Sequence, residues 1–93
     1  MRNVEDWKRE KLKDPAFKAA YDALEEEFAL ARELIGARAR AKLSQEEVAR
    51  RMGTSQSAVA RMESGRSLPS TTSLVKYAKA TGHQVRIKLS KVG

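Results

Sequence analysis

The residues with the clearest chemical potential are Ser55, Gln56 and Ser57, which stand in front of apolar residues at helical spacing. Nothing in that pattern would bury these short polar side chains. A glutamine amide can pair with an adenine edge through one donor and one acceptor, and a serine hydroxyl can reach a base or a phosphate. Arg61, further along the same expected helix, suits guanine or the sugar-phosphate backbone. The stretch therefore predicts contact with nucleic acid.

No set of residues in the chain supports catalysis. His83 is the only histidine and lies far in sequence from any aspartate, so no Ser-His-Asp arrangement is visible. The chain has no cysteine, which removes disulfides and thiolate metal sites. We expect no enzymatic activity, no catalytic residues, no metal and no cofactor.

The elements that must position the polar stretch are short helices. Ser44 and Glu47 form a capping-box pattern that begins one helix, and Gly53 ends it. Ser55 caps the next helix, and Gly65 ends that one. Further helices are expected at about 4–12, 15–42 and 71–81. Two short helices joined at a glycine predict a helix-turn-helix, whose second helix enters the major groove with its N-terminus first. The alternative is ordinary packing of two amphipathic helices.

The C-terminal segment changes its hydrophobic period. Val85, Ile87 and Leu89 alternate with polar residues, which predicts a β-strand. The chain has no second strand pattern, so this strand needs a partner outside its own chain. Antiparallel pairing with a second copy would form a dimer and hold two reading helices about 34 Å apart. Docking on the sheet edge of another protein is the alternative.

Charge and hydrophobicity divide the chain into two parts. Residues 1–33 carry seven Lys and Arg against nine Asp and Glu, whereas residues 34–93 carry twelve against three. The basic part indicates a polyanion partner such as DNA. The acidic part, with its run at 25–27, suits a basic protein. The helix expected at 15–42 also carries an apolar stripe that begins at Phe17 and can enter a hydrophobic groove of a partner. Alternatively, this stripe packs on the chain's own core or on a second copy.

The stretch from about Leu34 to Gly82 resembles the phage-repressor (Cro/Xre) helix-turn-helix family. The matching segments are LSQEEVARRMGTSQSAVARMESGRSLPS and LVKYAKATG. The resemblance implies a compact helical bundle that binds operator DNA as a dimer. It also implies an ion pair between Arg38 and Glu63, which we expect to be bidentate and partly buried. The expected DNA-binding residues are Gln45, Thr54, Ser55, Gln56, Ser57, Arg61, Arg66 and Ser67.

The flanks of this stretch are similar to the short antitoxins of HigA type in bacterial toxin–antitoxin pairs. The similar segments are LKDPAFKAAYDALEEEFALARELI and GHQVRIKL. This resemblance implies an antitoxin that binds a small basic RelE/HigB-like ribonuclease and represses its own operon. The expected toxin contacts are Trp7, Phe17, Tyr21, Leu24, Glu25 and Phe28.

Taken together, the sequence predicts an all-α fold. It is a helix-turn-helix bundle of about five helices with a long N-terminal helical extension and one short C-terminal strand that pairs across a dimer. The expected units are the extension at 1–29, the DNA-binding domain at 30–82, and the dimerisation strand and tail at 83–93. We expect operator DNA, a toxin and a second copy as partners, no membrane, and a place at the nucleoid in the bacterial cytoplasm. The alternatives are a stand-alone Xre-family regulator without a toxin and an adaptor that has lost DNA binding.

Overall fold

A computed structural model describes residues 4–11 and 13–92, with side chains from residue 8 onward. The described part contains α1 (Val4–Lys11), α2 (Pro15–Arg40), α3 (Gln45–Met52), α4 (Gln56–Met62) and α5 (Thr71–Ala80). The predicted all-helical bundle of five helices is therefore confirmed. Leu12, the expected last residue of the first helix, lies outside the described residues. None of these helices combines the length and the apolar character that crossing a membrane requires.

The longest element is α2, whose 26 residues span about 39 Å at the usual rise per residue. Asp14 caps its start: the carboxylate accepts a 2.9 Å hydrogen bond from the Ala16 N–H, and Pro15 occupies the first turn. The helix ends at Arg40, two residues before the expected end. Lys42 takes a left-handed conformation at φ 57°, and the Leu43 N–H bonds back to the Arg38 carbonyl oxygen at 3.2 Å.

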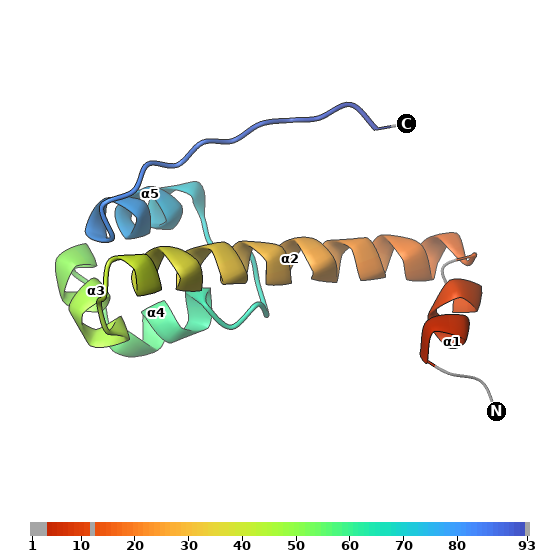
Figure 1. The fold of residues 1–93 in the computed structure, drawn as a ribbon, viewed down its shortest axis with the longest axis horizontal. Coiled ribbons are helices and arrows are strands. Elements are labelled where there is room, and N and C mark those ends of the chain that lie inside the picture. Colours follow the sequence, from red (N-terminus) through yellow and green to blue (C-terminus); the bar gives the residue numbers. More distant parts are fainter. Residues whose placement is uncertain (1–3, 12, 93) are drawn as a thin grey trace.

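Helices α3, α4 and α5 gather around the C-terminal half of α2, and α1 lies beside its N-terminal end (Figure 1). Side chains cap each of these three helices, and the caps of α3 and α4 are those that the sequence predicts. Ser44 and Glu47 form a complete capping box at α3, with both hydrogen bonds at 3.1 Å. Ser55 and Ser70 cap α4 and α5, again through 3.1 Å bonds from backbone N–H groups. Each of the three start points is therefore fixed by local chemistry.

The hydrophobic core lies where α2, α3, α4 and α5 meet. Val48, Val59 and Tyr77 are the largest completely buried side chains, one from each of the three short helices. Leu34 and Ala37 of α2 pack against them. Buried alanines in several of these helices let the backbones approach closely, which suits a small chain with few aromatic residues.

Burial changes along α2 near residue 30. Leu24 and Phe28 are about half exposed, at 50% and 48%, whereas Ala31 and Leu34 are buried. The predicted boundary between residues 29 and 30 therefore falls inside one continuous helix, at the point where the helix enters the core. The division into separate units stays a prediction.

Residues 83–92 form neither helix nor strand, and this segment runs extended beside the bundle (Figure 1). Ile87 and Leu89 are strongly exposed, at 69% and 93%. The predicted strand depends on a partner outside the chain, so its formation and the dimer pairing stay predictions.

The loop after α4 is held against α2 through Gly65. This glycine is buried, has a φ of 74°, and leaves room for the Phe28 ring: a methyl group added to it would lie 2.4 Å from the ring carbon Cδ1. Gly53, in the turn between α3 and α4, has nearly the same φ of 73° but has no neighbouring atom within 4 Å of that position. The two glycines therefore share a backbone requirement and differ in their packing.

We predict that Gly65→Ala destabilises the protein more than Gly53→Ala. Both changes place a side chain on a left-handed residue, which costs about 1 kcal/mol. Gly65→Ala must also displace the Phe28 ring, which raises its total loss to about 2–3 kcal/mol. Urea unfolding measures both values. Adding Phe28→Ala to Gly65→Ala should remove the steric part, and equal losses in the two single variants would contradict the contact.

Candidate nucleic-acid interface

The turn between α3 and α4 presents the front of α4 to solvent. Gly53 ends α3 in the left-handed conformation, and the Thr54 N–H bonds to the Ala49 carbonyl oxygen at 2.9 Å. Ser55, Gln56 and Ser57 follow directly, and all three side chains are exposed. Small residues there leave the helix N-terminus, with its unpaired N–H groups and positive dipole end, open to a partner.

Behind this surface, Glu63 at the end of α4 is a buried carboxylate with four hydrogen bonds. Arg38 of α2 binds it through two nitrogens on one edge of its guanidinium, Nε to Oε2 at 2.9 Å and Nη2 to Oε1 at 2.8 Å. The bidentate, partly buried pair that the resemblance implies is present, with side-chain exposures of 22% for Arg38 and 3% for Glu63. Gln45 donates to Oε1 at 3.1 Å, and the single hydroxyl proton of Tyr77 is shared between Oε2 and the Leu34 carbonyl oxygen, each at 2.7 Å. A carboxylate has about four acceptor sites, so Glu63 is saturated.

The electrostatics of Glu63 follow from these partners. Burial alone would raise the pKa of its carboxyl group, but the hydrogen bonds from Arg38, Tyr77 and Gln45 and the charge of Arg38 hold that pKa below its usual value. The hydrogen bond to Glu63 raises the pKa of Arg38. Burial and the neighbouring carboxylate raise the pKa of the Tyr77 phenol. Glu63 therefore stays ionised and Tyr77 stays protonated at neutral pH.

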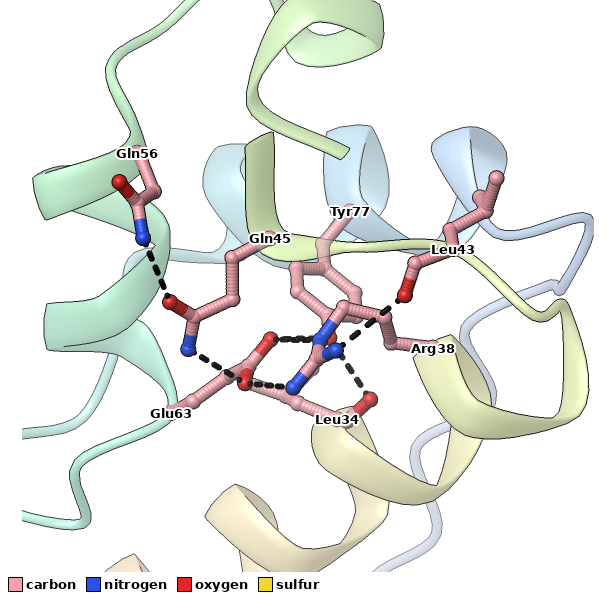
Figure 2. Close-up of polar contacts among 7 residues, drawn as sticks. All are labelled: Leu34, Arg38, Leu43, Gln45, Gln56, Glu63 and Tyr77. Atoms are coloured by element: carbon pink, nitrogen blue, oxygen red, sulfur yellow. Dashed lines mark hydrogen bonds and ion pairs between the residues drawn. The ribbon is translucent and has the colours of Figure 1, made fainter. Parts of the chain in front are cut away.

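A chain of amides leads from Glu63 to the surface (Figure 2). Gln45 begins α3 and donates from Nε2 to Glu63, while its Oε1 accepts a 3.2 Å hydrogen bond from Gln56 Nε2. The exposed amide of Gln56 is thus tied through one intermediate residue to the core. After this bond, Gln56 retains one N–H and its carbonyl oxygen, which are the donor and acceptor that an adenine edge requires.

The remaining DNA-binding candidates surround this pair on exposed positions. Thr54 precedes α4, Arg61 lies in its last turn, and Arg66 and Ser67 occupy the loop that follows. The loop is braced internally: Ser64 Oγ donates to the Arg61 carbonyl oxygen at 2.7 Å and accepts from the Arg66 N–H at 3.2 Å. The eight predicted residues therefore lie at the start of α3, on α4 and in the segments before and after α4, and Thr54, Arg61 and Ser67 line one hollow.

Sequence reasoning missed two parts of this arrangement. It gave Tyr77 no role, whereas the hydroxyl lies 2.7 Å from both Glu63 Oε2 and the Leu34 carbonyl oxygen. A tyrosine among buried positions needs a partner for its hydroxyl, which was the available signal. It also placed Gln45 and Gln56 separately on the DNA surface without the hydrogen bond between them.

The expected toxin contacts on α2 lie between Phe17 and Phe28, and Phe28 also packs against Gly65 in the loop after α4. The Trp7 side chain lies outside the described residues. Phe17 and Tyr21 stack with ring centroids 6.3 Å apart, and Lys8 Nζ of α1 lies 4.8 Å above the Tyr21 ring. Glu25 is exposed and, with Tyr21, Leu24 and Phe28, lines a groove along α2. Of the dimer candidates, Val85 is half-buried whereas Ile87 and Leu89 are exposed.

Comparison with known proteins agrees with this architecture. Residues 35–83, more than half of the chain, match the helix-turn-helix family. The match begins in the second half of α2 and ends just after α5.

The chain belongs to the helix-turn-helix family.

Among curated proteins, this helix-turn-helix chain is similar to Antitoxin HigA1 of Mycobacterium tuberculosis, in the strains CDC 1551 / Oshkosh and ATCC 25618 / H37Rv. In each case 40% of 76 aligned residues are identical, and the alignment covers 82% of this chain and 51% of the relative. The chain therefore spans about half the length of these curated relatives. No solved structure matches the chain significantly.

We predict that Glu63→Gln lowers the free energy of unfolding at pH 7 by about 2–3 kcal/mol, because Arg38 loses the charge of its partner in a largely dry site. The variant should also be less sensitive to acid. The native carboxyl has a lowered pKa, so its contribution is fully present above the unfolded glutamate pKa of about 4.3 and is lost as the pH falls through the native pKa.

Urea unfolding between pH 7 and pH 3 measures both effects. Glu47→Gln is the matched control, because the capping box also lowers the pKa of Glu47 but leaves the Arg38 pair intact. A Glu63→Gln variant with the stability and acid sensitivity of the native protein would show that the buried pair does not stabilise the bundle.

Proposed function

We propose that this chain binds double-stranded operator DNA through the front of α4 and thereby represses its own operon. The observation that carries the proposal is the exposed Gln56 amide, held through Gln45 by the buried Glu63 carboxylate. A base-reading side chain gains specificity when its orientation is fixed before binding, because less conformational freedom is lost. The free donor and acceptor of Gln56 suit an adenine in the major groove.

The residues around Gln56 have complementary roles in this proposal. Ser55 and Ser57 contact bases or phosphates beside it, and Arg61 reaches guanine or the backbone. Gln45 retains one N–H and one acceptor site after its two internal bonds, so it can also contact a phosphate. Thr54, Arg66 and Ser67 border the same surface and contact the sugar-phosphate backbone.

DNA recognition by this family of motifs usually uses two copies on a symmetric site. We propose that Val85, Ile87 and Leu89 pair with the same residues of a second copy. The exposure of Ile87 and Leu89 in an extended segment supports this, because a lone strand leaves both its apolar side chains and its ladder groups without partners.

We further propose that the chain is an antitoxin that binds and neutralises a small basic RelE/HigB-like ribonuclease. The N-terminal half of α2 supports this, since Leu24 and Phe28 are about half exposed beside Asp22, Glu25 and Glu26 in one groove. Apolar anchors bordered by carboxylates suit a basic partner, whose approach the charges would steer.

The comparison favours an antitoxin over a stand-alone regulator. The 76 aligned residues shared with Antitoxin HigA1 exceed the family match over 35–83, so the similarity continues into the flanks. A regulator without a toxin would need only the DNA-binding unit to resemble its relatives. The antitoxin reading thus explains the acidic extension as well as the bundle.

We predict that Leu24→Asp separates the two activities. An added carboxylate in the apolar stripe should abolish binding to a RelE/HigB-like toxin, because a charge would be buried without a partner. DNA binding should stay within about twofold of the native value, because Leu24 lines the groove along α2 and does not line the hollow beside α4. Co-purification with the toxin and fluorescence anisotropy with labelled duplex DNA measure the two properties.

Ala19→Asp is the matched control, because it places the same charge on an exposed position of α2 away from the stripe. It should leave both activities unchanged. Native toxin binding by the Leu24→Asp variant would contradict the antitoxin surface, and the absence of DNA binding by the native chain would contradict the reading role of α4.

A further inference from the structure

A second basic surface borders α4 on the side of α5. One hollow between α4 and α5 is lined by Arg61 and Lys76, and a neighbouring hollow at the ends of α3 and α5 is lined by Arg51 and Lys79. Lys76 and Met52 line both hollows, so the two are adjacent. We call this pair of adjacent hollows the α5 groove and define it by its four cations, Arg51, Arg61, Lys76 and Lys79.

The cations of the α5 groove form no ion pair within the part of the chain that the structure describes, although the charge of Arg51 contributes to the lowered pKa of Glu47, one turn before it on α3. All four side chains are exposed, none of them forms an ion pair there, and no carboxylate lines either hollow. Arg51 donates from Nη1 to the Ala80 carbonyl oxygen at 3.0 Å, which orients its guanidinium without cancelling its charge. Other cations of the chain differ, since Arg38 is paired with Glu63 and Lys18 with Asp22.

The α5 groove is also continuous with the proposed DNA surface. Its first hollow is lined by Thr54, Arg61 and Ser67, which belong to that surface, and by Ser73 of α5. Cations and hydroxyl groups along one open groove suit the regularly spaced oxygens of a phosphodiester strand. Four positive charges around two adjacent hollows that no carboxylate lines also attract a polyanion.

We infer that the α5 groove binds the sugar-phosphate backbone of the duplex that α4 reads, beyond the stretch of bases contacted by Gln56. This inference rests on the proposed DNA binding and adds Arg51, Lys76 and Lys79 to its contacts. Lysines act on phosphates as point charges and carry no base specificity. The groove therefore supplies affinity, register and salt dependence, while the front of α4 supplies sequence preference.

The test measures how DNA affinity depends on salt. Fluorescence anisotropy with a labelled duplex of mixed sequence gives the slope of log K against log salt concentration for the full chain. Each phosphate contact contributes about 0.9 to that slope. Lys76→Ala and Lys79→Ala should each reduce the slope by about 0.9 and weaken binding equally on every duplex sequence. Lys76→Arg should retain the native slope because it keeps the charge.

Lys13→Ala is the matched control, because it removes the same charge from an exposed residue at the other end of α2. It should leave the slope unchanged, and circular dichroism should show native helicity in each variant. Native slopes for both Lys76→Ala and Lys79→Ala would overturn the inference. The same slopes are expected if the groove binds an acidic protein instead of DNA. If the slopes are native but Gln56→Ala still weakens operator binding, the inference fails and the proposed function stands. If the native chain shows no salt-dependent DNA binding, the proposed function itself is contradicted.

Discussion

The buried carboxylate of Glu63 is the constraint on which the rest of the structure depends. A charge away from water is costly unless every acceptor site is filled, and the four donors come from three other helices. Arg38 brings α2, Gln45 brings α3 and Tyr77 brings α5 to the end of α4. One residue thereby fixes how four helices meet. An apolar residue of similar volume at this point could pack equally well, but it would give Gln45 nothing to bind.

This constraint reaches the surface through amide groups. Gln45 uses one donor and one acceptor internally, Gln56 uses one donor, and both keep hydrogen-bonding capacity for a partner. The bond to Gln45 therefore orients Gln56 and still leaves it the donor and the acceptor that the proposed adenine contact needs. The same helix α2 that supplies Arg38 at one end carries the exposed apolar stripe at the other (Figure 1). The contact between Phe28 and Gly65 is where that stripe meets the loop after α4.

The local features of the fold could be predicted from the sequence, because they depend on neighbouring residues. Ser44, Ser55, Ser70 and Asp14 cap the helices that follow them, and Gly53 takes the left-handed conformation of a tight turn. The pairing of Arg38 with Glu63 followed from a family resemblance, since nothing local connects residues 25 positions apart.

The parts that could not be predicted depend on three-dimensional proximity. The Gln45–Gln56 bond and the Tyr77 hydroxyl contacts join different helices, and the basic residues of the α5 groove come from three of them. Periodicity assigns such side chains to a face but not to a neighbour. The alternation at Val85–Leu89 indicates a strand, and its formation depends on a partner that the chain's own sequence does not contain.

The most direct test of the central claim is a double-mutant cycle on DNA binding. Operator duplex selected from a random-sequence pool would be titrated with the native chain, Gln45→Ala, Gln56→Ala and the double variant at one salt concentration. If Glu63 orients Gln56 through Gln45, each single change should cost about 1–3 kcal/mol, and the double variant should lose clearly less than the sum. Additive losses, or full affinity in the Gln45→Ala variant, would show that the buried carboxylate does not position the reading residue.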